Sequence, residues 1–194
     1  MSESQPAIAL SDAFGWLMLP AEDFLRQCQR TPYQASGPGG QKRNRVYSGI
    51  RFQHTSSGLR AESAAHREAA RNQKDALQKL RLELALAASR SVPLFADRAD
   101  RAAGDGAAQP DEPIAIPADF PAFRAKINPE HRDFPCVVLL GLIALRQSHG
   151  EPKGAGQQLG VSTSACVKFF AIHKQVSAEA NRIRERLGRP ALRV

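Results

Sequence analysis

The first half of the chain shows one strand pattern and two helix patterns. Apolar and polar positions alternate through residues 46–55, which is typical of a half-buried strand. A turn at residues 55–58 lets residues 59–63 return as the partner of a hairpin, and residues 29–34 are a further candidate strand. Residues 20–28 and 65–88 carry helical patterns, and the second is long and amphipathic. Its apolar stripe is Ala69, Gln73, Ala76, Leu77, Leu80, Leu84 and Ala87, and the basic residues expected off that stripe are Arg67, Arg71, Lys74 and Arg81.

The second half is purely helical in pattern. Helices are expected over residues 134–145, 154–159, 163–172 and 178–187, with Ser162 as an N-cap after a tight turn. Residues 91–117 are rich in Ala, Asp, Gly and Pro and lack an apolar period, so they predict a linker. The predicted fold is therefore α+β: a small mixed α/β domain in residues 1–90, with a short β-sheet packed on a long helix, then a small all-α module in residues 118–194. Trp16 to Leu19 are expected to pack against the first module.

The charge is concentrated in two basic blocks. The chain of 194 residues has a formal charge of +8, and its composition is that of a globular protein. Residues 26–90 carry 13 basic and 4 acidic side chains, residues 146–194 carry 9 and 3, and the segment between them is acidic. Such blocks favour a polyanionic partner, because Lys and Arg on phosphates release condensed counterions. A basic surface that only keeps the protein in solution fits the same numbers.

Neither the cysteines nor the histidines predict a metal site or a disulfide framework. The three cysteines are scattered, and Cys136 and Cys166 lie on apolar helical patterns, so we expect them in the core. His54, His66, His131, His149 and His173 occur singly and without ligand spacing, which predicts surface or capping roles. No apolar run reaches the length of a membrane span, and the N-terminus lacks the basic region of a signal peptide, so we expect no membrane partner and a cytoplasmic location.

A glycine-rich loop precedes the alternating strand. It reads Ser-Gly-Pro-Gly-Gly-Gln-Lys-Arg-Asn-Arg over residues 36–45. Three glycines in four residues let main-chain amides approach a substrate closely. The spacing is neither that of a Walker phosphate loop nor that of a dinucleotide fingerprint. Glycines beside basic residues are also common in surface loops without a function. The composition of the loop alone is compatible with a substrate-binding loop and with such a surface loop.

The particular string resembles the Gly-Gly-Gln (GGQ) catalytic domain of class I peptide chain release factors. The resemblance covers about residues 19–90 and includes Ala-Ser-Gly-Pro-Gly-Gly-Gln at 35–41, Ile-Arg-x-x-His at 50–54, Ser-Gly-Leu at 57–59, and Arg71-Asn72 and Leu80-Arg81 on the long helix. Many relatives open that helix with Arg-Ser-Gln, and the matching residues here are Arg67, Glu68 and Ala69.

The resemblance implies hydrolysis of the ester that joins a nascent peptide to tRNA in the peptidyl transferase centre of the large ribosomal subunit. The implied catalytic residues are Gly39, Gly40 and Gln41; the backbone N–H of Gln41 would stabilise the developing oxyanion, and its side-chain amide would favour water as the nucleophile. Ribosomal RNA and tRNA supply the remaining environment, so no cofactor is expected. The residues expected to contact rRNA or tRNA are Lys42, Arg43, Asn44, Arg45, Arg51, Arg67, Arg71, Arg182 and Arg186.

Nothing in the sequence resembles a stop-codon-reading domain, and the 18 residues ahead of the resemblance are too few to hold one. The chain therefore resembles the short, codon-independent members of the family that rescue stalled ribosomes, and we expect a monomer that binds the ribosome. Two alternatives remain. One is a non-catalytic ribosome-binding or RNA-binding factor that keeps the fold. The other is a DNA-binding regulator, because residues 155–170 resemble a helix-turn-helix unit, although its second helix has a single basic residue, Lys168.

Overall fold

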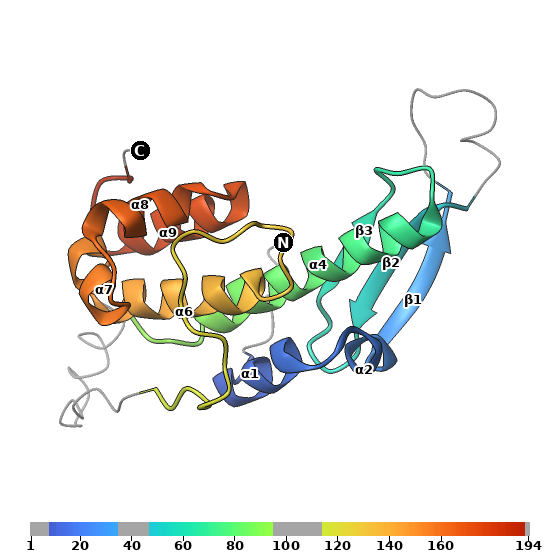
Figure 1. The fold of residues 1–194 in the computed structure, drawn as a ribbon, viewed down its shortest axis with the longest axis horizontal. Coiled ribbons are helices and arrows are strands. Elements are labelled where there is room, and N and C mark those ends of the chain that lie inside the picture. The colour runs from blue at the N-terminus through green and yellow to red at the C-terminus, as the bar shows by residue number, and fades with distance from the viewer. Residues whose placement is uncertain (1–7, 35–46, 95–113, 193–194) are drawn as a thin grey trace.

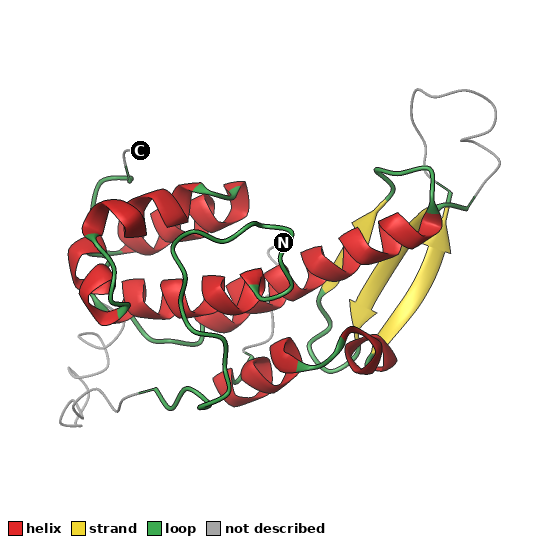
Figure 2. Cartoon of the chain, viewed as in Figure 1, coloured by secondary structure: helices red, strands yellow, loops and turns green. Residues whose placement is uncertain are grey.

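The fold is α+β, with a small sheet at one end of an elongated molecule and a group of helices at the other. The computed structural model describes residues 8–34, 47–94 and 114–192. Strands β1 (Cys28–Tyr33), β2 (Gly49–His54) and β3 (Arg60–Ser63) form an antiparallel sheet in that spatial order. The long helix α4 (Ala69–Ser89) crosses the sheet and continues into the helical end (Figures 1 and 2). The predicted sheet on a long helix is confirmed.

Alternation along β2 gives the sheet one buried face. Ile50, Phe52 and His54 are buried, while Arg51 between them is exposed. Pro32 is tolerated in β1 because β1 is an edge strand, where a missing backbone N–H costs least. Gly58, with a φ of +69°, provides the left-handed turn between β2 and β3.

Two short helices precede the sheet. α1 (Leu10–Met18) has no counterpart among the predicted elements, whereas α2 (Ala21–Arg26) matches the predicted helix at 20–28. Phe14 and Leu17 of α1 are buried, and Trp16, Met18 and Leu19 pack on the same core at partial exposure. The expectation that this apolar segment packs against the first module is confirmed.

The long helix begins four residues later than predicted. Glu68 has extended backbone angles, and the helix starts at Ala69 instead of Ala65. The reason lies in the side chain of Asn72, which hydrogen-bonds both backbone groups of His66 and so holds that residue in a turn ahead of the helix.

One basic residue that lies off the predicted apolar stripe of α4 is nevertheless buried. Only 2% of Arg81 is exposed. Its Nη2 donates to the carbonyl oxygen of Leu19 at 2.6 Å, and its guanidinium carbon lies 4.8 Å from the centroid of the Phe24 ring. The second half of α4 packs into two hydrophobic clusters on different sides of the helix, which a single apolar stripe cannot anticipate.

The helical end consists of α6 (Phe134–Gln147), α7 (Pro152–Gln158), α8 (Thr163–Ala171) and α9 (Lys174–Arg186). All four predicted helices are present, and α9 begins four residues earlier than expected because His173 caps it, accepting from the backbone N–H of Gln175. Ser162 caps α8 as predicted, since its Oγ accepts from the N–H of Ala165 at 3.2 Å. The left-handed residue in the α7–α8 turn is Gly160, with a φ of +68°.

The two halves share a hydrophobic core along α4 and α6. One face of α6, including Cys136, Leu139 and Ile143, packs into the cluster formed by the sheet, α1 and α4. The opposite face packs with Cys166, Phe169 and Phe170 of α8 in a second cluster, which Leu82 and Leu86 of α4 join. The expected burial of Cys136 and Cys166 is confirmed. Of the predicted linker, residues 95–113 lie outside the described residues, while Val92 and Leu94 are buried. The division into modules at residues 90 and 118 stays a prediction.

Candidate functional site

The glycine loop joins two neighbouring strands at one end of the sheet. Its catalytic candidates Gly39, Gly40 and Gln41, and the basic group Lys42, Arg43, Asn44 and Arg45, lie outside the described residues. The structure does describe both ends of the loop. Tyr33, the last residue of β1, lies opposite Gly49, the first residue of β2, in the antiparallel register. The loop therefore leaves and re-enters the fold beside the N-terminus of α4 (Figure 1).

The pair at the base of the loop requires a glycine. A Cβ on Gly49 would lie 2.8 Å from Cζ of Tyr33 and 2.9 Å from the Tyr33 carbonyl oxygen, both too close for any other residue. Gly49 thus lets the Tyr33 ring lie against β2, where the guanidinium carbon of Arg51 is 5.3 Å from the ring centroid. The Nη2 atom of Arg51 also lies 2.6 Å from Oε2 of Glu62 on β3. Arg51, one of the expected RNA contacts, is half-exposed and already holds two neighbours at the base of the loop.

Asn72 fastens the other end of the loop to the long helix. The residue is fully buried, and its Nδ2 donates to the carbonyl oxygen of Ser48 at 2.7 Å and to that of His66 at 2.8 Å. Its Oδ1 accepts from the N–H of His66 at 2.8 Å. One side chain therefore joins the residue that precedes β2, the turn before α4 and the first turns of α4. This clamp, Asn72 with Ser48 and His66, fixes where the loop re-enters the fold.

A second connection ties β3 to α4. Ser63 Oγ donates to Oδ2 of Asp75 at 2.5 Å, and Lys79 Nζ lies 3.0 Å from the same oxygen. Burial would raise the pKa of Asp75, but the hydrogen bonds from Ser63 and Lys79 and the charge of Lys79 outweigh it, and the pKa is lowered. The carboxylate therefore stays ionised and held toward β3.

The remaining basic residues predicted for RNA contact fall into two groups. Arg67 is exposed ahead of α4, and Arg71 is exposed in its first turn, with its Nε 3.0 Å from Oε2 of Glu68. Both lie near the end of the sheet that bears the loop. Arg182 and Arg186 are exposed on α9 at the helical end. The structure thus places Arg51, Arg67 and Arg71 at the end of the sheet where the loop begins and ends, and leaves the α9 pair apart from them.

His54 contradicts the surface role predicted for it. Its side chain is fully buried, with ring centroids 4.5 Å from Trp16 and 5.3 Å from Phe24. Burial lowers its pKa, so the ring is neutral at pH 7. The Ser57 N–H donates to Nδ1, which assigns the proton to Nε2, where Gln27 Oε1 lies 3.4 Å away. His54 follows Ile50 and Phe52 at a spacing of two, and continuing that alternation would have predicted its burial. The other histidines agree with the prediction: His131 and His173 accept backbone N–H groups, and His66 and His149 are exposed.

The helix-turn-helix pattern has little capacity to read a DNA groove in this structure. Cys166, Phe169 and Phe170 of α8 are buried against α6, so they are unavailable to a partner. The exposed positions of α8 carry one basic side chain, Lys168. Base-edge contacts in a groove need several polar or basic side chains on the reading helix.

Comparison with known proteins agrees with the sequence motifs over part of the chain. Residues 26–106, less than half of the chain, match the family model of the RF-1 domain. The match supports the resemblance of this part of the chain to the GGQ domain of the class I peptide chain release factors, and residues 26–106 are called the RF-1 domain below. Members of this domain family act on the ribosome and hydrolyse peptidyl-tRNA. Searches of curated proteins and of solved structures found no match to the chain.

The described residues contain neither a membrane-spanning helix nor a metal-binding cluster. No helix among them is both long and apolar enough to span a bilayer. Within residues 8–34, 47–94 and 114–192, His, Cys, Asp and Glu side chains do not gather in threes that could hold a metal ion.

Proposed function

We propose that this protein is a codon-independent peptidyl-tRNA hydrolase of the release-factor type, which frees nascent peptides from stalled ribosomes. The observation that carries the proposal is the RF-1 domain match over residues 26–106, which includes the intact Gly39-Gly40-Gln41 string. The architecture supports it, because the base of the loop is held by Tyr33, Gly49 and the Asn72 clamp at the tip of a narrow sheet. Such a shape suits insertion of a loop into the peptidyl transferase centre.

The proposed codon independence is supported by what the described residues around the RF-1 domain form. The described residues ahead of it form α1 and α2, and both pack into the domain's own core. The described residues after it form a helical module built on α4 and α6. Neither resembles a codon-reading domain. In the proposal, the helical module positions the protein on the ribosome, and Arg182 and Arg186 on its surface contact RNA.

The chemistry needs few protein groups. Ester hydrolysis places negative charge on the carbonyl oxygen in the transition state, and one preorganised N–H donor aimed at it contributes about 3 kcal/mol. The backbone N–H of Gln41 fills that role, and the side-chain amide of Gln41 selects water. The proposal needs no cofactor, and no general base from the protein.

The proposal is tested by peptide release with the wild-type protein. We expect release from ribosomes stalled without a stop codon and from isolated large subunits carrying peptidyl-tRNA, at rates that do not depend on the codon in the A site. Release restricted to stop codons would contradict codon independence. Binding to ribosomes without any release would instead favour the non-catalytic alternative.

The Asn72 clamp gives a prediction about the loop. Asn72→Ala leaves the carbonyls of Ser48 and His66 and the N–H of His66 without their buried partner, which should cost about 2–3 kcal/mol of unfolding free energy. Because the loop loses its anchor to α4, we expect the peptide-release rate of the folded variant to fall at least about tenfold, since misplaced reacting groups lose rate steeply. Urea unfolding and release assays measure the two effects.

Gln73→Ala is the matched control, because Gln73 is the next residue on α4 and its side chain makes no hydrogen bond with the described residues. It should behave as wild type in both assays. Full release activity in folded Asn72→Ala would show that the clamp does not position the loop.

A further inference from the structure

Tyr47 is an exposed aromatic residue at the point where the glycine loop re-enters the fold. It is 64% exposed, the largest fraction among the exposed large hydrophobic residues that the structure describes. Its side chain makes no hydrogen bond or ring contact with the described residues. The other tyrosine differs, because the ring of Tyr33 packs over Gly49 and lies 5.3 Å from the guanidinium carbon of Arg51. Of the two tyrosines in the chain, Tyr47 is thus the one that the described residues leave without a partner.

The Asn72 clamp holds the backbone at Tyr47 close to the start of α4. One amide nitrogen of Asn72 donates to the carbonyl oxygens of both Ser48 and His66, so these three residues lie side by side. Each of the three has an exposed neighbour in the sequence, and these neighbours are Tyr47, Arg67 and Arg71. The clamp therefore brings an exposed aromatic residue together with two exposed arginines that come from a different part of the chain.

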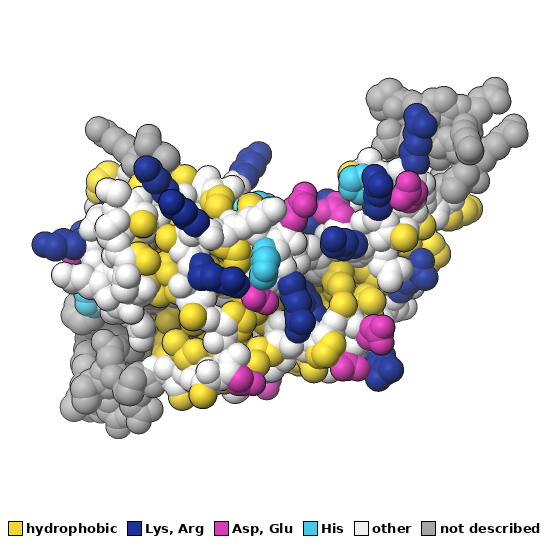
Figure 3. Space-filling view, viewed as in Figure 1, with side chains coloured by type: hydrophobic (Ala, Val, Ile, Leu, Met, Phe, Trp, Pro, Cys, Tyr) yellow, Lys and Arg dark blue, Asp and Glu magenta, His cyan; other side chains and the backbone are white. Residues whose placement is uncertain are grey.

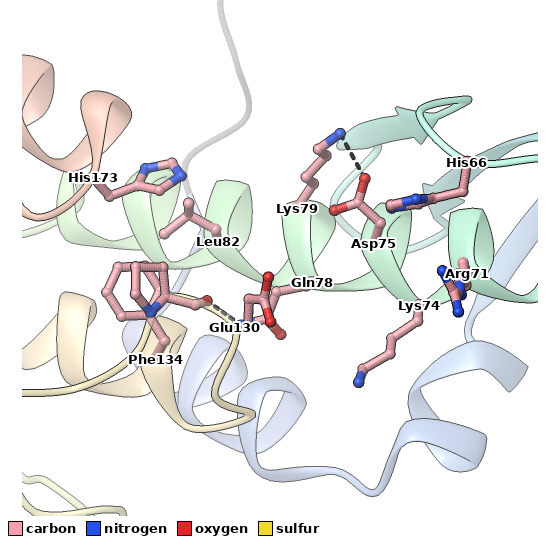
Figure 4. A pocket seen from close by; sticks show the side chains of 11 residues that line it. His66, Arg71, Lys74, Asp75, Gln78, Lys79, Leu82, Glu130, Phe134 and His173 are labelled. Atoms are coloured by element: carbon pink, nitrogen blue, oxygen red, sulfur yellow. Dashed lines mark hydrogen bonds and ion pairs between the residues drawn. The ribbon is translucent and has the colours of Figure 1, made fainter.

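The surroundings of this aromatic residue are basic. Residues 42–51 carry four basic side chains and no acidic one. Arg67 makes no ion pair with a described residue, and Arg71 pairs with Glu68 across side chains that are 68% and 66% exposed. Such an exposed pair contributes little free energy, so it does not occupy Arg71 permanently. Arg71 and His66 also line one end of a hollow of about 400 Å³ along α4 (Figure 4), and hydrophobic and basic side chains lie next to each other at this end of the molecule (Figure 3).

We propose that Tyr47 stacks on an unpaired base of ribosomal RNA in the large subunit and so holds the base of the glycine loop against the RNA. An exposed aromatic ring among exposed cations suits a single-stranded nucleotide, because the ring takes the base and the cations attract its phosphates. A protein partner would need a contiguous apolar patch, and the residues around Tyr47 are basic instead. Tyr47 is thus a positioning residue that takes no part in the hydrolysis itself. The choice of ribosomal RNA rests on the proposed function.

The test is the affinity of the full-length protein for vacant large ribosomal subunits, measured by co-sedimentation at low and at high salt. For Tyr47→Ala we expect about tenfold weaker binding at both salt concentrations, the loss of one stacked base. Tyr47→Phe should bind within about twofold of wild type, because stacking needs the ring and not the hydroxyl group. Arg67→Gln should also weaken binding, but its effect should shrink at high salt because it removes a charge.

A release assay separates binding from chemistry. Tyr47→Ala should raise the protein concentration that gives half-maximal peptide release about tenfold and leave the maximal rate unchanged, because the lost contact is the same before and during the reaction. Ile116→Ala is the matched control. Ile116 is also an exposed large hydrophobic residue, at 47%, but residues 111–119 around it carry three acidic side chains and no basic one. This variant should match wild type in both assays.

The inference is overturned if the wild-type protein does not bind vacant subunits, if Tyr47→Ala binds as tightly as wild type, or if Tyr47→Phe binds as weakly as Tyr47→Ala. A loss that appears only on subunits carrying peptidyl-tRNA also overturns it, since the base would then belong to tRNA. So does a larger loss of unfolding free energy in Tyr47→Ala than in Ile116→Ala, because the ring would then pack on the protein. Wild-type protein that shows the expected effect of Tyr47 on binding but releases no peptide would contradict the proposed function alone.

Discussion

Alanine at Gly40 should slow peptide release from large subunits carrying peptidyl-tRNA by at least about a hundredfold, the usual cost of losing one oxyanion donor. Under the proposed function the donor is the backbone N–H of Gln41, and its direction depends on the backbone path through Gly39 and Gly40. A Cβ at Gly40 removes backbone conformations that only glycine adopts freely. Gln41→Ala keeps the backbone donor, so we expect a smaller loss of rate and a greater acceptance of nucleophiles other than water.

The matched control is Gly15→Ala. Gly15 is an exposed residue of α1, and a Cβ there would meet nothing within 4 Å. The same change of residue should therefore raise stability by about 0.5–1 kcal/mol, because glycine is a poor helix former, and leave release unchanged. If Gly40→Ala releases peptide as fast as Gly15→Ala and binds the ribosome equally well, the loop takes no part in the catalytic step. The proposed function would then be wrong.

The sequence predicted helices and strands well where the element has one buried face and the other face is exposed to solvent. The alternation of β2 and the recurrence of Leu80 and Leu84 on α4 both gave the correct buried faces, because each of these residues faces a single layer. α1 was not predicted, although Phe14 and Leu17 are buried in it. Its start lacks a capping side chain, so the usual signal of a helix N-terminus is missing.

The burial of Arg81 and Arg146 was not predicted, because their partners are distant in sequence. Arg81 bonds a carbonyl 62 positions away, and Arg146 bonds the carbonyl of Val92 from 54 positions away. No local pattern encodes such pairs, and a charged residue is by default assigned to solvent.

The candidate site was also predicted only in part. Its motif could be identified from the sequence, because the string Gly39-Gly40-Gln41 and the Arg71-Asn72 pair are local in sequence. The function of Asn72 as a clamp was not, since it depends on Ser48, which lies 24 positions away and only the folded hairpin brings near. A hollow lined by Lys74, Gln78 and Phe134 was not predicted either, because residues 129–134 line it from the other half of the chain.

The second large effect is expected at Glu179, which holds the helical module to the RF-1 domain. Its side chain is 4% exposed and faces Arg146, which is 3% exposed, with Nη2 of Arg146 3.5 Å from Oε1. Nη2 of Arg90, the residue that follows α4, lies 2.9 Å from Oε2. Arg146 also donates to the carbonyl oxygen of Val92 at 2.9 Å. One carboxylate of α9 thus joins α6 and the end of α4, and it is the counter-charge that lets Arg146 remain buried.

Glu179→Ala should therefore lower the free energy of unfolding by about 3–5 kcal/mol, because the guanidinium of Arg146 is left buried without its anion. Urea unfolding measures the change, and Glu185→Ala, at an exposed position of the same helix, is the matched control with an expected change below about 0.5 kcal/mol. Adding Arg146→Met to Glu179→Ala should recover part of the loss, since an apolar side chain of similar length needs no counter-charge. The buried pair is not what joins the two halves if Glu179→Ala has the same free energy of unfolding as the control. The same conclusion holds if Glu179→Ala/Arg146→Met loses more unfolding free energy than the two single variants lose together. The expected recovery would instead identify the Glu179–Arg146 pair as part of what joins the helical module to the end of α4.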